Sequence, residues 1–249
     1  MRVALTLLIT ACLPLAVAQD KPIDKPKNIR VSTWVREDLF AGFLEGDMAR
    51  HAQGEKKLDS ILAGNPNAAD AWGWKGGAEL LHAVRAYEAG DIAGFEAGYA
   101  KAKVAFARTA EIAKQIPQYG VALHAIAGGS FTVFGDRMPP QYRREAWQNV
   151  RAHYTALRAI QKDEFDKLPV HFRGEIMAGL AQAAQRLGEA ENAKTLTQEL
   201  ATALPGTPYA VFAKRWLDQP ETMAKSKVTC ATCHDAGRLQ AVLNAAPGN

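Results

Sequence analysis

Apolar residues recur at helical spacing through the middle of this chain, from Trp34 to Leu217. In one run the intervals are 3, 4, 3 and 3 residues, which places the apolar side chains on one face of a helix. That run consists of Trp147, Val150, Tyr154, Leu157 and Ile160. Alanine is abundant here, and neither β-branched runs nor Asn-Gly hairpin turns occur. The pattern therefore predicts an all-α fold.

Glycine and proline divide this region into separate helices. Gly46-Asp47, Gly90-Asp91 and Gly188-Glu189 predict tight turns between paired helices, and prolines mark further helix ends. The segments between these breaks are about 12 to 25 residues long. We therefore expect about eight or nine helices joined by short turns.

The composition is that of a folded globular protein. Of the 249 residues, 48% are hydrophobic and 22% are charged, which excludes a wholly disordered chain. The formal net charge is +4, which is too small to indicate nucleic-acid binding by itself, and we expect no nucleic-acid partner.

The first 18 residues have the pattern of a secretory signal peptide. Arg2 precedes an uncharged stretch that reaches Val17, and Ala16-Val17-Ala18 is a cleavage sequence followed by polar Gln19-Asp20. The uncharged stretch is about 15 residues, short of the ~20 of a membrane span. We predict cleavage after Ala18, a periplasmic or secreted protein, and no transmembrane segment in the mature chain.

A lipoprotein signal is the second alternative for this terminus. Ile9-Thr10-Ala11-Cys12 resembles a lipobox, but the apolar run before Cys12 is short for that role. Residues 19–33 are polar, contain Pro22 and Pro26, and are interpreted as a flexible leader. The helical domain is expected over residues 34–218, and a separate C-terminal segment over 219–249.

Part of the helical region resembles the tetratricopeptide repeat (TPR), a 34-residue helix pair with a fixed pattern of large, small and proline positions. Residues 174–207 fit that pattern at Met177, Leu180, Ala181, Ala193, Leu200 and Pro205, whereas Ala184 and Thr197 stand where aromatics are usual. Residues 65–76 match it in part. The resemblance implies a TPR-like array of antiparallel helix pairs, an α-solenoid or bundle, whose concave surface binds peptides or protein partners.

The C-terminal segment contains a Cys-x-x-Cys-His motif. It reads Cys230-Ala231-Thr232-Cys233-His234, and after signal cleavage Cys230 and Cys233 are the only cysteines of the chain. The motif resembles the attachment site of cytochromes c. That resemblance implies one covalent haem c on Cys230 and Cys233, with His234 as the proximal iron ligand.

Three other interpretations of this motif compete with haem. Two exported cysteines this close can form a Cys230–Cys233 disulfide. A thioredoxin-like redox pair normally follows a strand of a βαβ unit, and none is predicted here. A structural zinc site needs four ligands, whereas the motif offers three closely spaced ones. We favour haem, and the disulfide is the main alternative.

A sixth iron ligand has to come from upstream or be absent. Only 15 residues follow His234, and none is Met or His. The upstream candidates are His51, His82, His124, His153 and His171, followed by Met177 and Met223. We place His124 and His171 first, because His124 stands in an apolar stretch and His171 at a predicted helix start. Two axial side chains favour electron transfer, and an open iron favours ligand or peroxide chemistry.

The sequence thus predicts an exported monohaem c-type cytochrome-like protein. Its helical domain would dock a protein redox partner or a peptide, and we favour electron transfer or binding over catalysis. The alternatives are a haem-free TPR-like binding scaffold with a disulfide, and a haem peroxidase-type enzyme.

One charged feature also invites interpretation. Arg144, Arg151 and Arg158 are seven residues apart and share a helical face with Arg143 nearby. We interpret this basic stripe as a solvated surface rather than a docking site for an acidic partner.

Overall fold

The computed structural model describes residues 31–225, and within that range every regular element is a helix, as the sequence predicts. No helix in this part of the chain is long and apolar enough to cross a membrane. The elements are α1 (Thr33–Phe40), the π-helical turn η1 (Ala41–Glu45), α2 (Met48–Gly64), α3 (Ala69–Glu88), α4 (Ile92–Gln115), α5 (Tyr119–Phe134), η2 (Gly135–Arg137), α6 (Pro140–Ile160), η3 (Phe165–Lys167), α7 (Val170–Arg186), α8 (Ala190–Ala203), α9 (Pro208–Asp218) and η4 (Pro220–Lys225).

Several predicted sites lie outside these described residues. They are the signal peptide over residues 1–18 with the lipobox cysteine Cys12, the leader up to residue 30, and the motif residues Cys230, Cys233 and His234.

Local sequence signals set the helix ends. Asp47 and Asp91 accept hydrogen bonds from the backbone N–H groups of Arg50 and Gly94, which satisfies otherwise unpaired donors at the starts of α2 and α4. The glycines of the three predicted turns, Gly46, Gly90 and Gly188, have positive φ angles. Gly206 has a positive φ angle as well.

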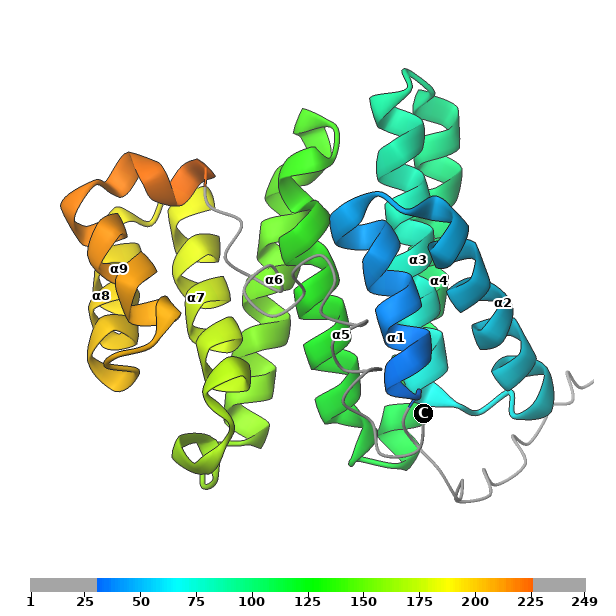
Figure 1. Ribbon diagram of the computed structural model, residues 1–249, viewed down its shortest axis with the longest axis horizontal. Coiled ribbons are helices and arrows are strands. Elements are labelled where there is room, and N and C mark those ends of the chain that lie inside the picture. The colour runs from blue at the N-terminus through cyan, green and yellow to red at the C-terminus, as the bar shows by residue number, and fades with distance from the viewer. Residues whose placement is uncertain (1–30, 226–249) are drawn as a thin grey trace, which may run out of the picture.

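The helices stand side by side, with α1 between α5 and α3, so the molecule is an elongated layer rather than a closed bundle (Figure 1). Helices α8 and α9 form one end, and α2, α3 and α4 form the other. Each helix packs chiefly on its neighbours in sequence, and α3 also packs on α5. One apolar core runs through the array from Val31 to Met223, so each helix pair depends on the next to cover its apolar side.

Tyr154 shows how closely the central helices approach. Its fully buried ring on α6 lies against Gly128 of α5 and Gly179 of α7, and a Cβ atom at either glycine would overlap the ring. The two glycines therefore allow α5, α6 and α7 to pack as one unit.

Two arginines of the basic stripe on α6 form ion pairs with glutamates at the N-cap of α8 or within it. Arg151 forms an ion pair with Glu189, and Arg158 forms one with Glu199. Arg143 donates instead to the Met138 carbonyl oxygen at 2.8 Å. Most of the predicted solvated face therefore bridges structural elements.

Candidate functional site

The histidines of the described residues lie on five different helices. His51 is on α2, His82 on α3, His124 on α5, His153 on α6 and His171 on α7. Packing brings four of them together as two groups between neighbouring helices, and His171 lies apart from both.

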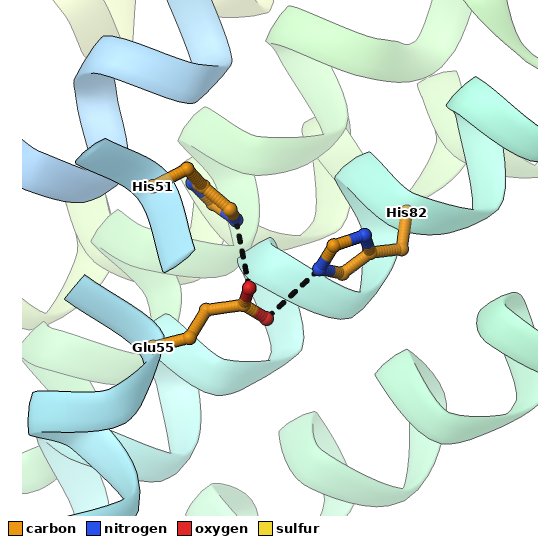
Figure 2. Close-up of side chains that lie close together, drawn as sticks. All are labelled: His51, Glu55 and His82. Carbon is orange, nitrogen blue, oxygen red and sulfur yellow. Dashed lines mark hydrogen bonds and ion pairs between the residues drawn. The ribbon is translucent and has the colours of Figure 1, made fainter. Parts of the chain in front are cut away.

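The first group, the histidine–glutamate cluster, consists of His51, Glu55 and His82. Figure 2 shows both imidazole rings turned toward the Glu55 carboxylate. His82 Nε2 lies 2.9 Å from Glu55 Oε1, and His51 Nε2 lies 3.8 Å from Glu55 Oε2. One potential ligand atom from each residue lies within 4.8 Å of the others, and no other group of three His, Cys, Asp or Glu side chains in the described part of the chain meets this criterion.

His51 is held rigidly at the back of this cluster. Its side chain is fully buried, and its Nδ1 atom lies 3.1 Å from the Leu39 carbonyl oxygen. The ring packs against Gly42 and Phe43 of the π-helical turn, and a Cβ atom at Gly42 would lie 2.6 Å from it. Helix α1 thus supplies the backbone acceptor for this ring, and the π-turn that follows it supplies the glycine that leaves room for it.

Burial and charge act differently on the members of this cluster. The hydrogen bond to Glu55 raises the pKa of His82 despite partial burial. Burial lowers the pKa of His51, although Leu39 and Glu55 oppose the effect. Burial also acts to raise the pKa of Glu55, but the His82 hydrogen bond and nearby positive charges outweigh it, so this carboxyl has a lowered pKa.

The second group, the histidine pair, consists of His124 and His153. Their Nδ1 atoms lie 3.0 Å apart across the α5–α6 interface, and the His153 ring stacks on Phe131 at an interplanar angle of 11°. Burial lowers the pKa of His124, and burial together with His124 lowers that of His153 to about 4. Both rings are therefore neutral at pH 7, with one Nδ1–H donating to the other ring's Nδ1 lone pair.

The surface around His124 is apolar. Helix α5 contains no charged residue, and the half-buried positions next to His124 are Val121, Ala122 and Ala125. No carboxylate contributes to the pKa shift of either ring in the pair.

The other predicted ligand, His171, has a polar environment. Its Nδ1 lies 3.3 Å from the Tyr209 hydroxyl, and its Nε2 lies 3.8 Å from Glu175 Oε2 on the same helix. Both upstream methionine candidates, Met177 and Met223, are buried in the core.

Comparison of the chain with protein-family models, with curated proteins and with solved structures finds no match. The function is therefore inferred from the residues themselves.

Glu55 is the residue that sequence reasoning missed. His51 and Glu55 are four residues apart on α2, a spacing that places two side chains on one helix face and is readable from sequence. The approach of His82 from α3 is not readable, because it depends on how α2 packs against α3.

Proposed function

We propose that this protein is an exported monohaem c-type cytochrome-like protein that transfers electrons and docks its partner through a TPR-like helical domain. Cys230 and Cys233 hold the haem covalently, and His234 is the proximal ligand. When bound, haem supplies an iron that exchanges single electrons. The observation that carries the proposal is the Cys230-Ala231-Thr232-Cys233-His234 motif, which holds the only two cysteines that remain once the predicted signal peptide is cleaved.

The environment of His124 supports it as the sixth ligand. An iron ligand must be a neutral imidazole, and burial keeps the pKa of His124 low. Donation from His124 Nδ1 to His153 leaves the Nε2 lone pair of His124 for the metal, which is the arrangement that usually orients a ligating histidine. The uncharged surface of α5 is also suited to cover an apolar porphyrin. His171 is the second choice because Glu175 and Tyr209 already engage its ring.

The chain between Lys225 and His234 is long enough for His234 and His124 to bind the same iron. The Met223 and Ala224 carbonyl oxygens accept hydrogen bonds from Arg186, and the same guanidinium binds Asp136 immediately after α5. His124 lies about 15 Å along α5 from that end, at 1.5 Å per residue. The nine residues that follow Lys225, up to His234, extend to at most about 30 Å.

The helical pairing supports the TPR-like part of the proposal. Helices α7 and α8 pack against each other across the Gly188 turn. The repeat positions Met177, Leu180, Ala193 and Leu200 are all buried, as a stacked repeat requires.

Spectroscopy of directed variants tests this function. The full chain is expressed in a host with periplasmic haem-attachment machinery, beside His234→Ala and the double variant Cys230→Ser/Cys233→Ser. We expect a low-spin c-type spectrum from the wild type, loss of that spectrum in His234→Ala, and no covalent haem in the double variant. An unchanged spectrum in His234→Ala contradicts the ligand assignment. A wild type without a Soret band, carrying a Cys230–Cys233 disulfide, contradicts the function and favours a haem-free binding scaffold.

A further inference from the structure

We propose that His51, Glu55 and His82 form a binding site for one Zn²⁺ ion, separate from the haem. The ligands are Nε2 of each imidazole and the Glu55 carboxylate, and a water molecule completes the tetrahedron. Two histidines, one glutamate and a water form a known zinc ligand set with an open position.

The donor separations suit a single small cation. Tetrahedral donors at about 2.1 Å from zinc lie about 3.4 Å from one another. The observed Glu55 oxygens lie 2.9 Å from His82 Nε2 and 3.8 Å from His51 Nε2, on either side of that value. One donor atom from each residue lies within 4.8 Å of the others, so small side-chain adjustments bring all three donors to one ion.

The protonation of His51 provides independent support. A carbonyl oxygen only accepts hydrogen bonds, so Nδ1 of His51 carries the hydrogen donated to Leu39. Nε2 of the neutral ring is then a bare lone pair. This atom is fully buried, has no hydrogen-bond partner, and its nearest charged neighbour is a carboxylate oxygen that also lacks a proton. Two electron-pair acceptors face each other, and a cation between them would satisfy both.

The surroundings of the cluster resemble the support that metal ligands usually have. A ligating histidine commonly donates its second ring N–H to a backbone carbonyl, as His51 does to Leu39. Gly42 and Phe43 hold the ring from the other side. The ion can enter from solvent, because the His82 side chain is 44% exposed and that of Glu55 is 26% exposed.

The chain contains a matched pair without the third ligand. His171 and Glu175 on α7 have the same four-residue spacing and the same 3.8 Å Nε2–Oε2 distance as His51 and Glu55. No third His, Cys, Asp or Glu ligand joins them within the described residues. Glu175→Gln is therefore a control for the general effect of removing a helical glutamate.

Calorimetric zinc titration of the full mature chain tests the proposal. After removal of bound metal with a chelator, ZnCl₂ is titrated into the wild type, Glu55→Gln, His82→Asn and Glu175→Gln. Each variant is also made with Cys230→Ser/Cys233→Ser, so that zinc bound by the C-terminal motif is recognised. Circular dichroism of each metal-free variant verifies that it folds.

We expect one zinc ion per chain in both cysteine backgrounds. Loss of a direct ligand in Glu55→Gln or His82→Asn should weaken binding by more than ~100-fold, above the 10–100-fold typical of losing a supporting residue. Glu175→Gln should bind as the wild type does, and Mg²⁺ should not compete, because it prefers oxygen ligands. The proposal is overturned if folded Glu55→Gln and His82→Asn bind zinc like the wild type. It is equally overturned if the serine double variant loses all binding, or if the wild-type Kd is weaker than about 1 mM.

Discussion

His51 and His82 meet on either side of a carboxylate, whereas His124 and His153 meet each other directly. The same side chain therefore has two electrostatic settings in one helical array. Glu55 gives the first group a negative charge that a proton or a cation can neutralise, and the pKa of His82 is raised accordingly. The second group lacks such a charge, and burial lowers the pKa of both its rings.

This difference shows how packing gives identical residues distinct chemical surroundings. A neutral, half-buried imidazole on an uncharged helix suits an iron that already lies in a porphyrin. Two imidazoles and a carboxylate suit a free divalent ion, because the site itself must supply the charge and most of the ligands.

The largest effect that separates the two groups is expected from His124→Ala in the haem-loaded protein. Loss of the sixth ligand should convert the spectrum from low spin to high spin. His82→Ala, in the other group, should leave the spectrum unchanged. Visible and electron paramagnetic resonance spectra measure both variants. A low-spin spectrum that survives in His124→Ala but is lost in His171→Ala would move the ligand to α7.

A smaller effect is expected from Gly42→Ala, which tests whether the π-helical turn positions His51. The new methyl group would lie 2.6 Å from the imidazole, and such overpacking costs about 1–3 kcal/mol. Urea unfolding measures the loss of stability, and zinc affinity should fall with it. The control is Gly64→Ala at the exposed end of α2, where no atom lies within 4 Å of the added carbon. Equal stability of the two variants would show that the turn does not restrain the ring.

The smallest effect is the pH dependence of stability, in which His82 should act with the opposite sign to His51, His124 and His153. The lowered pKa values of His153, His124 and His51 mean that the unfolded chain binds more protons below pH 6.5. Their contribution therefore destabilises the fold as the pH falls from 6.5 toward 4. The raised pKa of His82 means that its stabilisation is present below 6.5 and is lost as the pH rises through its folded value.

Two variants separate these contributions. His153→Gln should flatten the decrease in stability on the acid side, and Glu55→Gln should flatten the decrease at higher pH. Urea unfolding as a function of pH measures both slopes, and NMR titration of the imidazole protons assigns them. A His153 pKa near 6.5 would contradict the buried, neutral pair.

The fold follows from local sequence signals to a large extent. Alanine-rich apolar periodicity predicts helices, and Gly46, Gly90 and Gly188 mark their turns because each adopts a positive φ. Interactions between different helices were harder to predict from the sequence. The arginines of α6 lie on a predicted solvated face, yet Arg151 and Arg158 form ion pairs with Glu189, just before α8, and with Glu199 of α8.

The candidate sites likewise differ in whether the sequence alone predicts them. The Cys230–His234 motif is contiguous, so its chemistry is readable from sequence alone. His124 and His153 are 29 residues apart in the sequence, and Glu55 and His82 are 27 residues apart. Such contacts depend on the packing of neighbouring helices, and helical periodicity within one segment does not encode them.

The central claim is that the chain carries one covalent haem c, and the intact mass of the denatured mature protein tests it most directly. Protein produced with haem-attachment machinery should have the mass of residues 19–249 plus one haem, with a Soret band that survives denaturation. A mass two hydrogens below that of the bare chain, without a Soret band, would contradict the claim and identify a Cys230–Cys233 disulfide instead.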